Sequence, residues 1–177
     1  MASPYYTGET LDAAARYWQE KDARSTRLDA ARLRPLVEQY LQAHNTCALA
    51  TGAGDFVRCT PIEYSWHDGC FWMFSEGGQK FRALAQNPNV CLAVFDPYTG
   101  FASLHGVQVT GRAELVEPFS PAYLAHAEYK KLSRAFLEKL QSPMHLIRVW
   151  PRRMECLFSD FKEWGCAPRQ TLEWAAE

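Results

Sequence analysis

The feature that most constrains this chain is a run of β-strand segments between Thr46 and Glu117. Short stretches rich in Val, Phe, Tyr, Trp and Thr alternate there with turn residues, as consecutive strands do. The predicted strands cover residues 46–50, 56–64, 70–74, 90–95 and 101–117. A glycine-rich turn at 51–55 and the turn His67-Asp68-Gly69 join the first three strands, because glycine and Asp-Gly readily adopt positive φ angles. We expect these three strands to form an antiparallel meander.

Four segments have the three- and four-residue apolar spacing of amphipathic helices. They cover residues 10–23, 29–45, 77–86 and 121–140, and Asp29 and Pro121 stand where helices commonly begin. Two further strands, at 145–150 and 154–158, flank Pro151-Arg152-Arg153 as a closing hairpin. Gly106 and Gly111 interrupt the long strand 101–117, where glycine usually marks a bend or a bulge.

Seven or so strands with few helices predict a mainly β fold with peripheral helices. We expect an antiparallel six- to seven-stranded β-barrel, because closure of a sheet removes its exposed edges. With 177 residues, of which 47% are hydrophobic and 22% charged, the chain has the size and composition of one globular domain. Residues 1–44 are expected to form an N-terminal helical segment and residues 159–177 a C-terminal tail of that domain.

Charge and hydropathy exclude several function classes. The 19 Lys and Arg residues against 20 Asp and Glu give a net charge of −1, without the basic run that supplies most affinity for nucleic acid. No apolar stretch of about 18 residues is present to span a membrane, and no secretory leader pattern stands at the N-terminus. We therefore expect a cytoplasmic protein that binds neither nucleic acid nor membranes.

The six cysteines lie at least ten positions apart, whereas zinc ligands usually occur in pairs two to four residues apart. We expect buried free thiols and no metal site.

The sequence also excludes some apparent motifs. Gly52 and Gly54 lack the third glycine and the following helix of a dinucleotide-binding turn, and His126 with Glu128 lacks the second histidine of a zinc-protease helix. We expect His126 and Glu128 to be solvated, and no serine or cysteine has the neighbours of a hydrolytic nucleophile.

One group of residues has the chemistry of a phosphate site. Arg58-Cys59-Thr60-Pro61 lie on one predicted strand, Phe74-Ser75 end the next, and Gly78-Gln79-Lys80 open the short helix 77–86. A helix start offers free amides and the positive end of its dipole, and a lysine with an arginine can neutralise a dianion. A surface turn with solvated cations has the same composition, so the residues alone leave both interpretations open.

The order and spacing of these motifs resemble those of the pyridoxamine 5′-phosphate oxidase-like proteins, the family of the FMN-binding split barrel. The similarity runs from about Leu41 to Phe158. It includes Glu76-Gly77-Gly78, Asn87-Pro88-Asn89-Val90, the strand 107–114 and the segment 148–155. The resemblance implies a homodimer of split β-barrels with two FMN molecules in the subunit interface. Aromatic residues are enriched at interfaces, so we expect Trp150, Trp164 and Trp174 to be buried between subunits.

The resemblance also implies a set of cofactor-binding residues. These are Arg58, Cys59, Thr60, Pro61, Phe74, Ser75, Gln79, Lys80 and Gln108. Arg58, Gln79 and Lys80 would hold the FMN phosphate, and residues 59–61 would lie along the isoalloxazine ring, mainly through backbone groups. Phe74 and Ser75 would border the phosphate and the ribityl chain, and Gln108 would reach the cofactor from the long strand.

Several positions depart from the pattern of the true oxidase. Glu63 stands where a second basic residue is expected, Gly106 where a glutamine is expected, and Leu157 where a tryptophan is expected. Residues 161–166 contain no counterpart of the arginine and histidine that grip the oxidase substrate. The resemblance therefore implies an FMN-binding fold, but not the oxidation of pyridoxamine phosphate.

Three functions follow from these expectations. The first is a flavoprotein oxidoreductase that acts on a small molecule with a nicotinamide donor, NAD(P)H, since the flavin performs the redox step and the protein orients it. His105 could donate a proton near the ring, although a strand histidine is more often structural. The second is a non-catalytic protein that binds FMN or haem, with His67, His105 or His145 as the axial ligand. The third is a dimerisation scaffold without a cofactor, which Glu63 would favour by weakening the phosphate site.

Overall fold

Eight strands form one antiparallel sheet in the computed structural model, which describes residues 6–174. Along the chain the strands are β1 (Thr46–Ala53), β2 (Phe56–Glu63), β3 (Ser65–His67), β4 (Cys70–Ser75), β5 (Asn89–Phe95), β6 (His105–Val116), β7 (His145–Phe158) and β8 (Arg169–Glu173). Their order across the sheet is β2-β1-β5-β6-β7-β4-β3, and β8 also pairs with β7. The mainly β fold is confirmed, and β8 lies in the tail 159–177, where the sequence predicts no strand.

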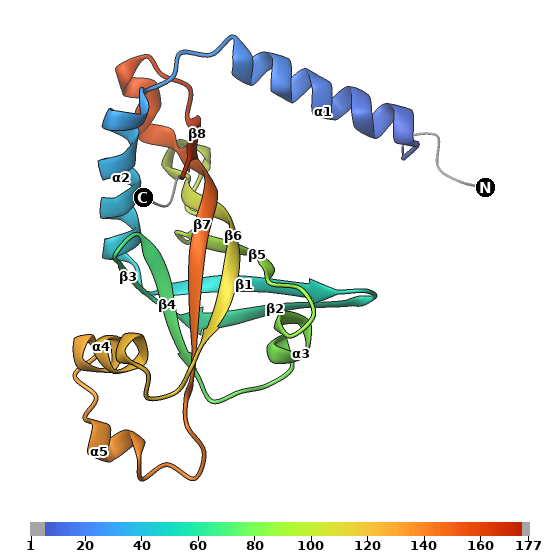
Figure 1. The fold of residues 1–177 in the computed structure, drawn as a ribbon. Coiled ribbons are helices and arrows are strands. Elements are labelled where there is room, and N and C mark those ends of the chain that lie inside the picture. The colour runs from blue at the N-terminus through green and yellow to red at the C-terminus, as the bar shows by residue number, and fades with distance from the viewer. Residues whose placement is uncertain (1–5, 175–177) are drawn as a thin grey trace.

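A single residue joins the two edges of the sheet. β2 and β3 stand at opposite ends of the strand order, yet only Tyr64 separates them in the chain. The sheet therefore curls until its edges meet at Tyr64, which gives a barrel that is closed there and split elsewhere (Figure 1). Tyr64 is 2% exposed, and its hydroxyl donates a hydrogen bond to the carbonyl oxygen of Leu41 at 2.8 Å. The predicted meander is confirmed for its first two strands, because β1 pairs with β2. It is wrong for the third, because β4 pairs with β3 and β7 rather than with β2.

The last long strand is continuous. β7 passes straight through Pro151, so the predicted closing hairpin of two strands is wrong. The register between β6 and β7 shifts where Thr110 pairs with Arg153 and Gly111 pairs with Pro151, which leaves Arg152 as the extra residue of a β-bulge. A proline is tolerated there because a bulge interrupts the ladder of backbone hydrogen bonds.

The two glycines of β6 have different structural roles. A Cβ added at Gly111 would lie 2.7 Å from the carbonyl oxygen of Trp150, so the two backbones approach too closely for a side chain. Gly106 pairs regularly with Phe95 on β5 and Leu157 on β7, and the bend expected there is absent. Only Gly111 marks a bulge, as the sequence predicts.

Within the described part of the chain, five α-helices and two 3₁₀ turns accompany the sheet (Figure 1). They are α1 (Gly8–Ala23), α2 (Ala30–Ala43), α3 (Lys80–Leu84), α4 (Pro121–Tyr129), α5 (Arg134–Leu137), η1 (Phe101–Ser103) and η2 (Ser159–Trp164). The predicted helix 77–86 is shorter, because Gly77 and Gly78 have φ angles of 131° and 104°. The predicted helix 121–140 breaks at Lys131, whose φ is 58°, and restarts where the Ser133 side chain caps α5. The predicted strand 101–117 begins only at His105. No helix within residues 6–174 is long and apolar enough to cross a membrane.

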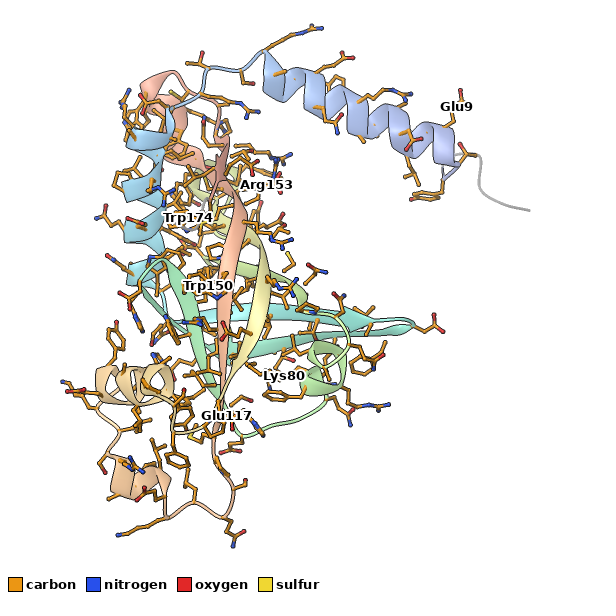
Figure 2. The ribbon with its side chains drawn as sticks, viewed as in Figure 1. Glu9, Lys80, Glu117, Trp150, Arg153 and Trp174 are labelled. Carbon is orange, nitrogen blue, oxygen red and sulfur yellow. The ribbon has the colours of Figure 1, made fainter. Side chains whose placement is uncertain are left out.

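The molecule has two buried apolar clusters. The larger one fills the barrel and includes Leu33, Val37 and Leu41 of α2, a helix that begins at the Asp29 cap as predicted. Trp174 belongs to this cluster, at 6% exposure, and lies beside α2 under the guanidinium of Arg34 (Figure 2). Its expected place between subunits is therefore wrong.

The smaller cluster lies between β4, β7, α4 and α5, around Trp72, Tyr123 and Leu146. In contrast, α1 points away from the barrel (Figure 1). The side chains of Leu11 and Tyr17 are more than half exposed. The helix predicted at 10–23 is present, but Leu11 and Tyr17 are not part of either cluster.

All six cysteines are free thiols, but only half of them are buried. Burial raises the pKa of Cys47 to about 12 and the pKa of Cys70 and Cys156 to about 11. Cys59 and Cys91 are exposed, contrary to expectation, because the side chains of these β2 and β5 residues face away from the barrel core. Residues 6–174 contain no group of three or more His, Cys, Asp or Glu side chains placed to hold a metal ion.

Candidate functional site

Arg58 and Lys80 are 22 positions apart in the sequence, but in the structure they lie near enough for the charge of Arg58 to act on Lys80. Arg58 lies on β2 opposite Thr51 of β1, and Lys80 is the first residue of α3, which packs on both strands (Figure 2). Lys80 is 7% exposed, and its Nζ donates a hydrogen bond to the carbonyl oxygen of Gly77 at 2.6 Å. Burial, together with the positive charge of Arg58, lowers the pKa of Lys80.

The end of β4 supplies the loop that holds this lysine. The Ser75 Oγ accepts a hydrogen bond from the Gly77 amide at 3.3 Å, which fixes the turn that leads into α3. Gly78 has a φ of 104°, and a Cβ there would lie 3.9 Å from Lys80 Nζ. Ser75 and Lys80 are thus connected through Gly77, and the charge of Arg58 acts on Lys80. Their role in binding a cofactor stays a prediction.

The two cations have no neutralising partner in the part of the chain that the structure describes. Neither Arg58 nor Lys80 forms an ion pair with a carboxylate of residues 6–174. Glu63, the nearby acidic residue of β2, faces the opposite side of the strand and pairs with Lys130 Nζ at 2.6 Å. The site therefore keeps its positive charge, which suits an anion.

Two buried hydroxyls on the same face also lack partners. Among the described residues, Thr51 Oγ1 and Thr60 Oγ1 are buried without a hydrogen bond. Thr60 lies two residues from Arg58 on β2, and Thr51 is the cross-strand partner of Arg58. A buried hydroxyl without a partner costs about 1–3 kcal/mol, so a polar ligand at this face would recover that free energy.

The side chains of two residues that the sequence predicts near the phosphate, Gln79 and Phe74, contact other residues of the protein. Gln79 is exposed, and its Oε1 accepts a hydrogen bond from Arg82 Nη1 at 3.3 Å. The Phe74 ring points into the smaller cluster, 5.4 Å from the ring of Tyr123 and 5.0 Å from that of His126. Because α3 has only five residues, its dipole is weak, and the positive potential comes from the two side-chain cations rather than from the expected helix start.

Cys59 and Pro61 lie on the other face of β2. The strand register aligns Cys59 with Ala50 and Cys91, and Pro61 with Ala48, Ala93 and Gln108. Directly paired residues present their side chains on the same face of a sheet. The outer face of the barrel therefore carries a floor of small side chains, formed by Ala48, Ala50, Cys59, Pro61, Cys91 and Ala93, with Gln108 at its far side. A planar ring can lie flat on such a surface.

A cleft of 430 Å³ adjoins this small-residue floor at Ala93 and Gln108. Its walls come from the ends of β5, β6 and β7 and from the segment between β5 and β6, and they include Phe95, His105 and Glu155. Nothing in the spacing of these residues along the sequence indicates a shared cavity, because three separate strands supply them.

The His105 side chain is held between two carboxylates. Its Nε2 lies 3.2 Å from Asp160 Oδ2, and its Nδ1 lies 3.9 Å from Asp96 Oδ2. Asp96 in turn accepts a hydrogen bond from the Tyr40 hydroxyl at 3.0 Å and lies 2.7 Å from His44 Nε2. This arrangement fixes the imidazole of His105 at the wall of the cleft.

Comparison with known proteins identifies the family. The family model described as pyridoxamine 5′-phosphate oxidase matches residues 33–157. The chain belongs to this family. A search of curated proteins gives no match to the sequence.

Solved structures of the same fold support the assignment. An FAD-binding protein from Mesorhizobium loti has 21% sequence identity and a TM-score of 0.56, over 73% of this chain and 93% of that one. The FAD-binding protein from Mycobacterium smegmatis has 19% identity and a TM-score of 0.55, over 85% and 100% of the two chains. The haem storage protein HutZ from Vibrio cholerae has 18% identity and a TM-score of 0.54, over 71% and 91%. The pyridoxamine 5′-phosphate oxidase fold of this chain is thus shared by flavin-binding and haem-binding proteins.

Within this family fold, two of the departures noted in the sequence line the cleft. Gly106 and Leu157 are cross-strand partners of β6 and β7, and both contribute to the cleft wall. A Cβ at Gly106 would lie 3.3 Å from both Phe95 Cβ and the Val94 carbonyl oxygen. A side chain at position 106 would therefore press on β5 at the cleft wall.

A histidine of α4 that the sequence predicts to be solvated is buried instead. His126 of α4 is 2% exposed, and its Nδ1 lies 3.0 Å from His67 Nε2, so its expected solvation is wrong. Glu128, on the other side of α4, is exposed as expected. Sequence spacing did not reveal the His67–His126 pair because the two residues come from a hairpin and a helix that are 59 positions apart.

Proposed function

We propose that this protein binds FMN, with the phosphate held by Arg58 and Lys80. The observation that carries the proposal is the pair of neighbouring cations without a carboxylate partner in residues 6–174, one of them on a buried lysine. A dianionic phosphate compensates two such charges. The unpartnered hydroxyls of Thr51 and Thr60 and the Ser75–Gly77 turn offer further polar contacts on the same side.

The isoalloxazine ring is proposed to lie along β2 toward the outer face. The small-residue floor matches the flat shape of a flavin, and the backbone of β2, an edge strand, has free donors and acceptors for the ring edge. Cys59 and Pro61 would line the ring with their side chains, Thr60 would do so through its backbone, and Gln108 would contact the ring from β6. Three of these four side chains share the outer face, which supports their joint role.

The proposed activity is that of an oxidoreductase that acts on a small molecule with NAD(P)H as electron donor. FMN would supply the electron-transfer chemistry, and the chain would orient the reactants and exclude water. The 430 Å³ cleft beside Gln108 has the size of a small-molecule site and lies where a substrate would reach the ring. His105 would serve as the proton donor of the cleft, because it lines the cleft wall and its Nδ1, 3.9 Å from Asp96 Oδ2, is beyond hydrogen-bond distance of that carboxylate.

We propose that the protein acts as a homodimer. Exposed apolar side chains gather on the outer face and on the neighbouring β5–β6 segment, among them Val57, Phe95, Tyr98 and Phe101, with exposures of 63% or more. A second barrel placed on this face would cover these side chains and would close the ring between two subunits. Trp164, which is 51% exposed, is also available for such a contact.

The haem alternative has less support from the geometry. Both ring nitrogens of His67 face other side chains, at Asp68 and His126, and those of His105 face Asp160 and Asp96. Only His145, the third expected axial ligand, is exposed at the start of β7. The scaffold alternative loses its main argument, because Glu63 pairs with Lys130 and leaves the cation pair intact.

The test compares flavins that differ only at the phosphate end. FMN and riboflavin are titrated, by flavin fluorescence, into the wild-type protein, into Lys80→Ala and into a charge-matched control, Lys162→Ala, which alters an exposed lysine of η2. We expect Lys80→Ala to weaken FMN binding roughly 10- to 100-fold and to leave riboflavin binding unchanged, because a charge-assisted phosphate contact is lost. The control should bind both flavins as the wild type does.

Two results would overturn the proposal. Equal affinity of the wild type for FMN and riboflavin would contradict the proposed phosphate site. Absence of binding for both would contradict flavin binding itself. A preference for FAD over FMN would keep a flavin but would contradict the assignment of Arg58 and Lys80 to a terminal phosphate.

A further inference from the structure

Two histidines connect the β3–β4 hairpin to α4. His67 ends β3, and its Nε2 lies 3.0 Å from Nδ1 of His126 in the middle of α4. The ring centroids are 5.2 Å apart and the rings are tilted by 17°, which is the geometry of an in-line hydrogen bond between imidazoles. On its other side, His67 Nδ1 lies 2.8 Å from Asp68 Oδ2.

The partners of His67 fix where the protons lie. The Asp68 carboxylate only accepts hydrogen bonds, so His67 Nδ1 carries a hydrogen and donates it. With both imidazoles neutral, His67 Nε2 accepts from His126 Nδ1–H. With one added proton, His67 donates from both nitrogens and His126 Nδ1 accepts. A second proton places two N–H donors face to face, and the hydrogen bond between the rings is lost.

Two aromatic rings lie against His67: the ring of Trp72, at 5.2 Å and 3°, and the ring of Tyr129, at 4.3 Å and 28°. Together with the contact to Asp68, they hold the imidazole of His67 in place opposite His126.

The second proton is opposed at His126. This side chain is 2% exposed, and burial, the facing His67 and the charge of Lys130 lower the pKa of His126 to about 4. Other charged groups near the pair are already matched: Lys130 pairs with Glu63 at 2.6 Å, and Arg148 of β7 pairs with Glu114 of β6 at 2.6 Å. The remaining titratable neighbour on the sheet is Cys70, whose thiol stays neutral because burial raises its pKa to about 11.

Protons can reach the pair from solvent. His67 and His126 both line a cavity of 360 Å³ between β4, β7 and α4, together with Trp72, Tyr129 and Trp150. The helix itself is short, with nine residues, and it buries only Tyr123, His126 and Ala127. The imidazole contact therefore adds a polar attachment to the apolar contacts that Tyr123 and Ala127 make in the smaller cluster.

We propose that His67 and His126 form a proton-controlled latch, which holds α4 against the sheet at neutral pH and releases it when both imidazoles are protonated. The latch does not depend on any bound cofactor. Its geometric basis is the direct imidazole contact, the burial of one partner and the stacking of the other.

The latch is tested on the full chain by hydrogen exchange and histidine NMR. Long-range ¹H–¹⁵N spectra of histidine-labelled protein report the protonation state of each imidazole between pH 8 and pH 4.5. Amide exchange of residues 121–129, corrected for the intrinsic effect of pH, reports release of α4. The pKa of His126 is about 4 when α4 is docked and takes its ordinary value of 6.5 when α4 is released. This difference changes the docking equilibrium constant about 30-fold between pH 8 and pH 5. We expect α4 protection to fall by that factor, in parallel with protonation of His126.

Variants separate the latch from a general effect of acid. His126→Asn should lose the pH dependence of α4 exchange, whereas the control His145→Asn, which alters the exposed histidine of β7, should keep it. If His126→Asn does not fold, His67→Asn provides the test: with the facing charge removed, release should move to lower pH. A 30-fold change retained in His126→Asn, an unmoved midpoint in His67→Asn, or a protonated His126 in a fully protected α4 would each overturn the proposal.

Discussion

Substitution of Gly111 should destabilise the fold more than any other glycine substitution on β6. An added Cβ would lie 2.7 Å from the Trp150 carbonyl oxygen and 2.9 Å from Val149 Cγ1. The oxygen belongs to the backbone of β7, so β6 and β7 must separate by about 0.5 Å at the bulge to accept a methyl group. Such overpacking costs about 3 kcal/mol, and the lower entropy of alanine in the unfolded chain returns less than 1 kcal/mol. We therefore expect Gly111→Ala to lower the free energy of unfolding by about 2 kcal/mol.

Urea unfolding followed by tryptophan fluorescence measures this loss. With an m-value of about 2 kcal/mol/M, the unfolding midpoint should fall by about 1 M. Gly106→Ala is the matched control on the same strand, because its Cβ would meet its nearest neighbours at 3.3 Å and the register there is regular. The control should move the midpoint by less than half as much. Equal midpoints for the two variants would refute the argument that the bulge requires a glycine.

Two further predictions follow from burial. Iodoacetamide at pH 8 should label the partly exposed Cys166 and leave Cys47 unlabelled until the protein unfolds, because Cys47 is 3% exposed and a pKa of about 12 leaves about one thiolate in ten thousand. Peptide mass spectrometry reads both sites, and equal labelling rates would contradict the burial of Cys47. The folded pKa of His126 lies below its unfolded value of 6.5, so its contribution to stability is complete above pH 6.5 and is lost as the pH falls toward 4. The free energy of unfolding of the wild type, measured by urea titration, should fall by roughly 3 kcal/mol over that range. His126→Asn should not show this fall, and identical pH profiles of the two proteins would contradict the lowered pKa of His126.

Local sequence signals predict most of the strands and their turns. The Asp68-Gly69 turn has φ angles of 52° and 67°, as the hairpin motif requires, and the Asp29 side chain accepts a hydrogen bond from the Arg32 amide at 2.8 Å, as a helix cap does. Strand pairing is different, because it depends on contacts between distant residues. The position of Tyr64 between two sheet edges and the passage of β7 through Pro151 are set by tertiary packing, and no local pattern predicts either.

The candidate site shows the same division. The order of the motifs predicts Arg58 and Lys80 in one phosphate site, and in the structure the charge of Arg58 acts on Lys80. The alternation of side chains along β2 sends Arg58 and Thr60 to one face and Cys59 and Pro61 to the other, so consecutive residues of one motif cannot share one contact surface. The cleft and the burial of His126 depend on elements far apart in the chain, which explains why sequence patterns do not predict them.

The open edge of β2 has a consequence for how molecules of this protein behave in concentrated solution. An exposed edge strand is where chains from different molecules add to one another and aggregate. Pro61 lies on this edge and has no amide hydrogen, so it interrupts the row of donors that a foreign strand would need. Pro61, a residue of the small-residue floor, therefore also protects the barrel against strand addition. Its replacement by a residue with an amide hydrogen would make the edge a template for aggregation.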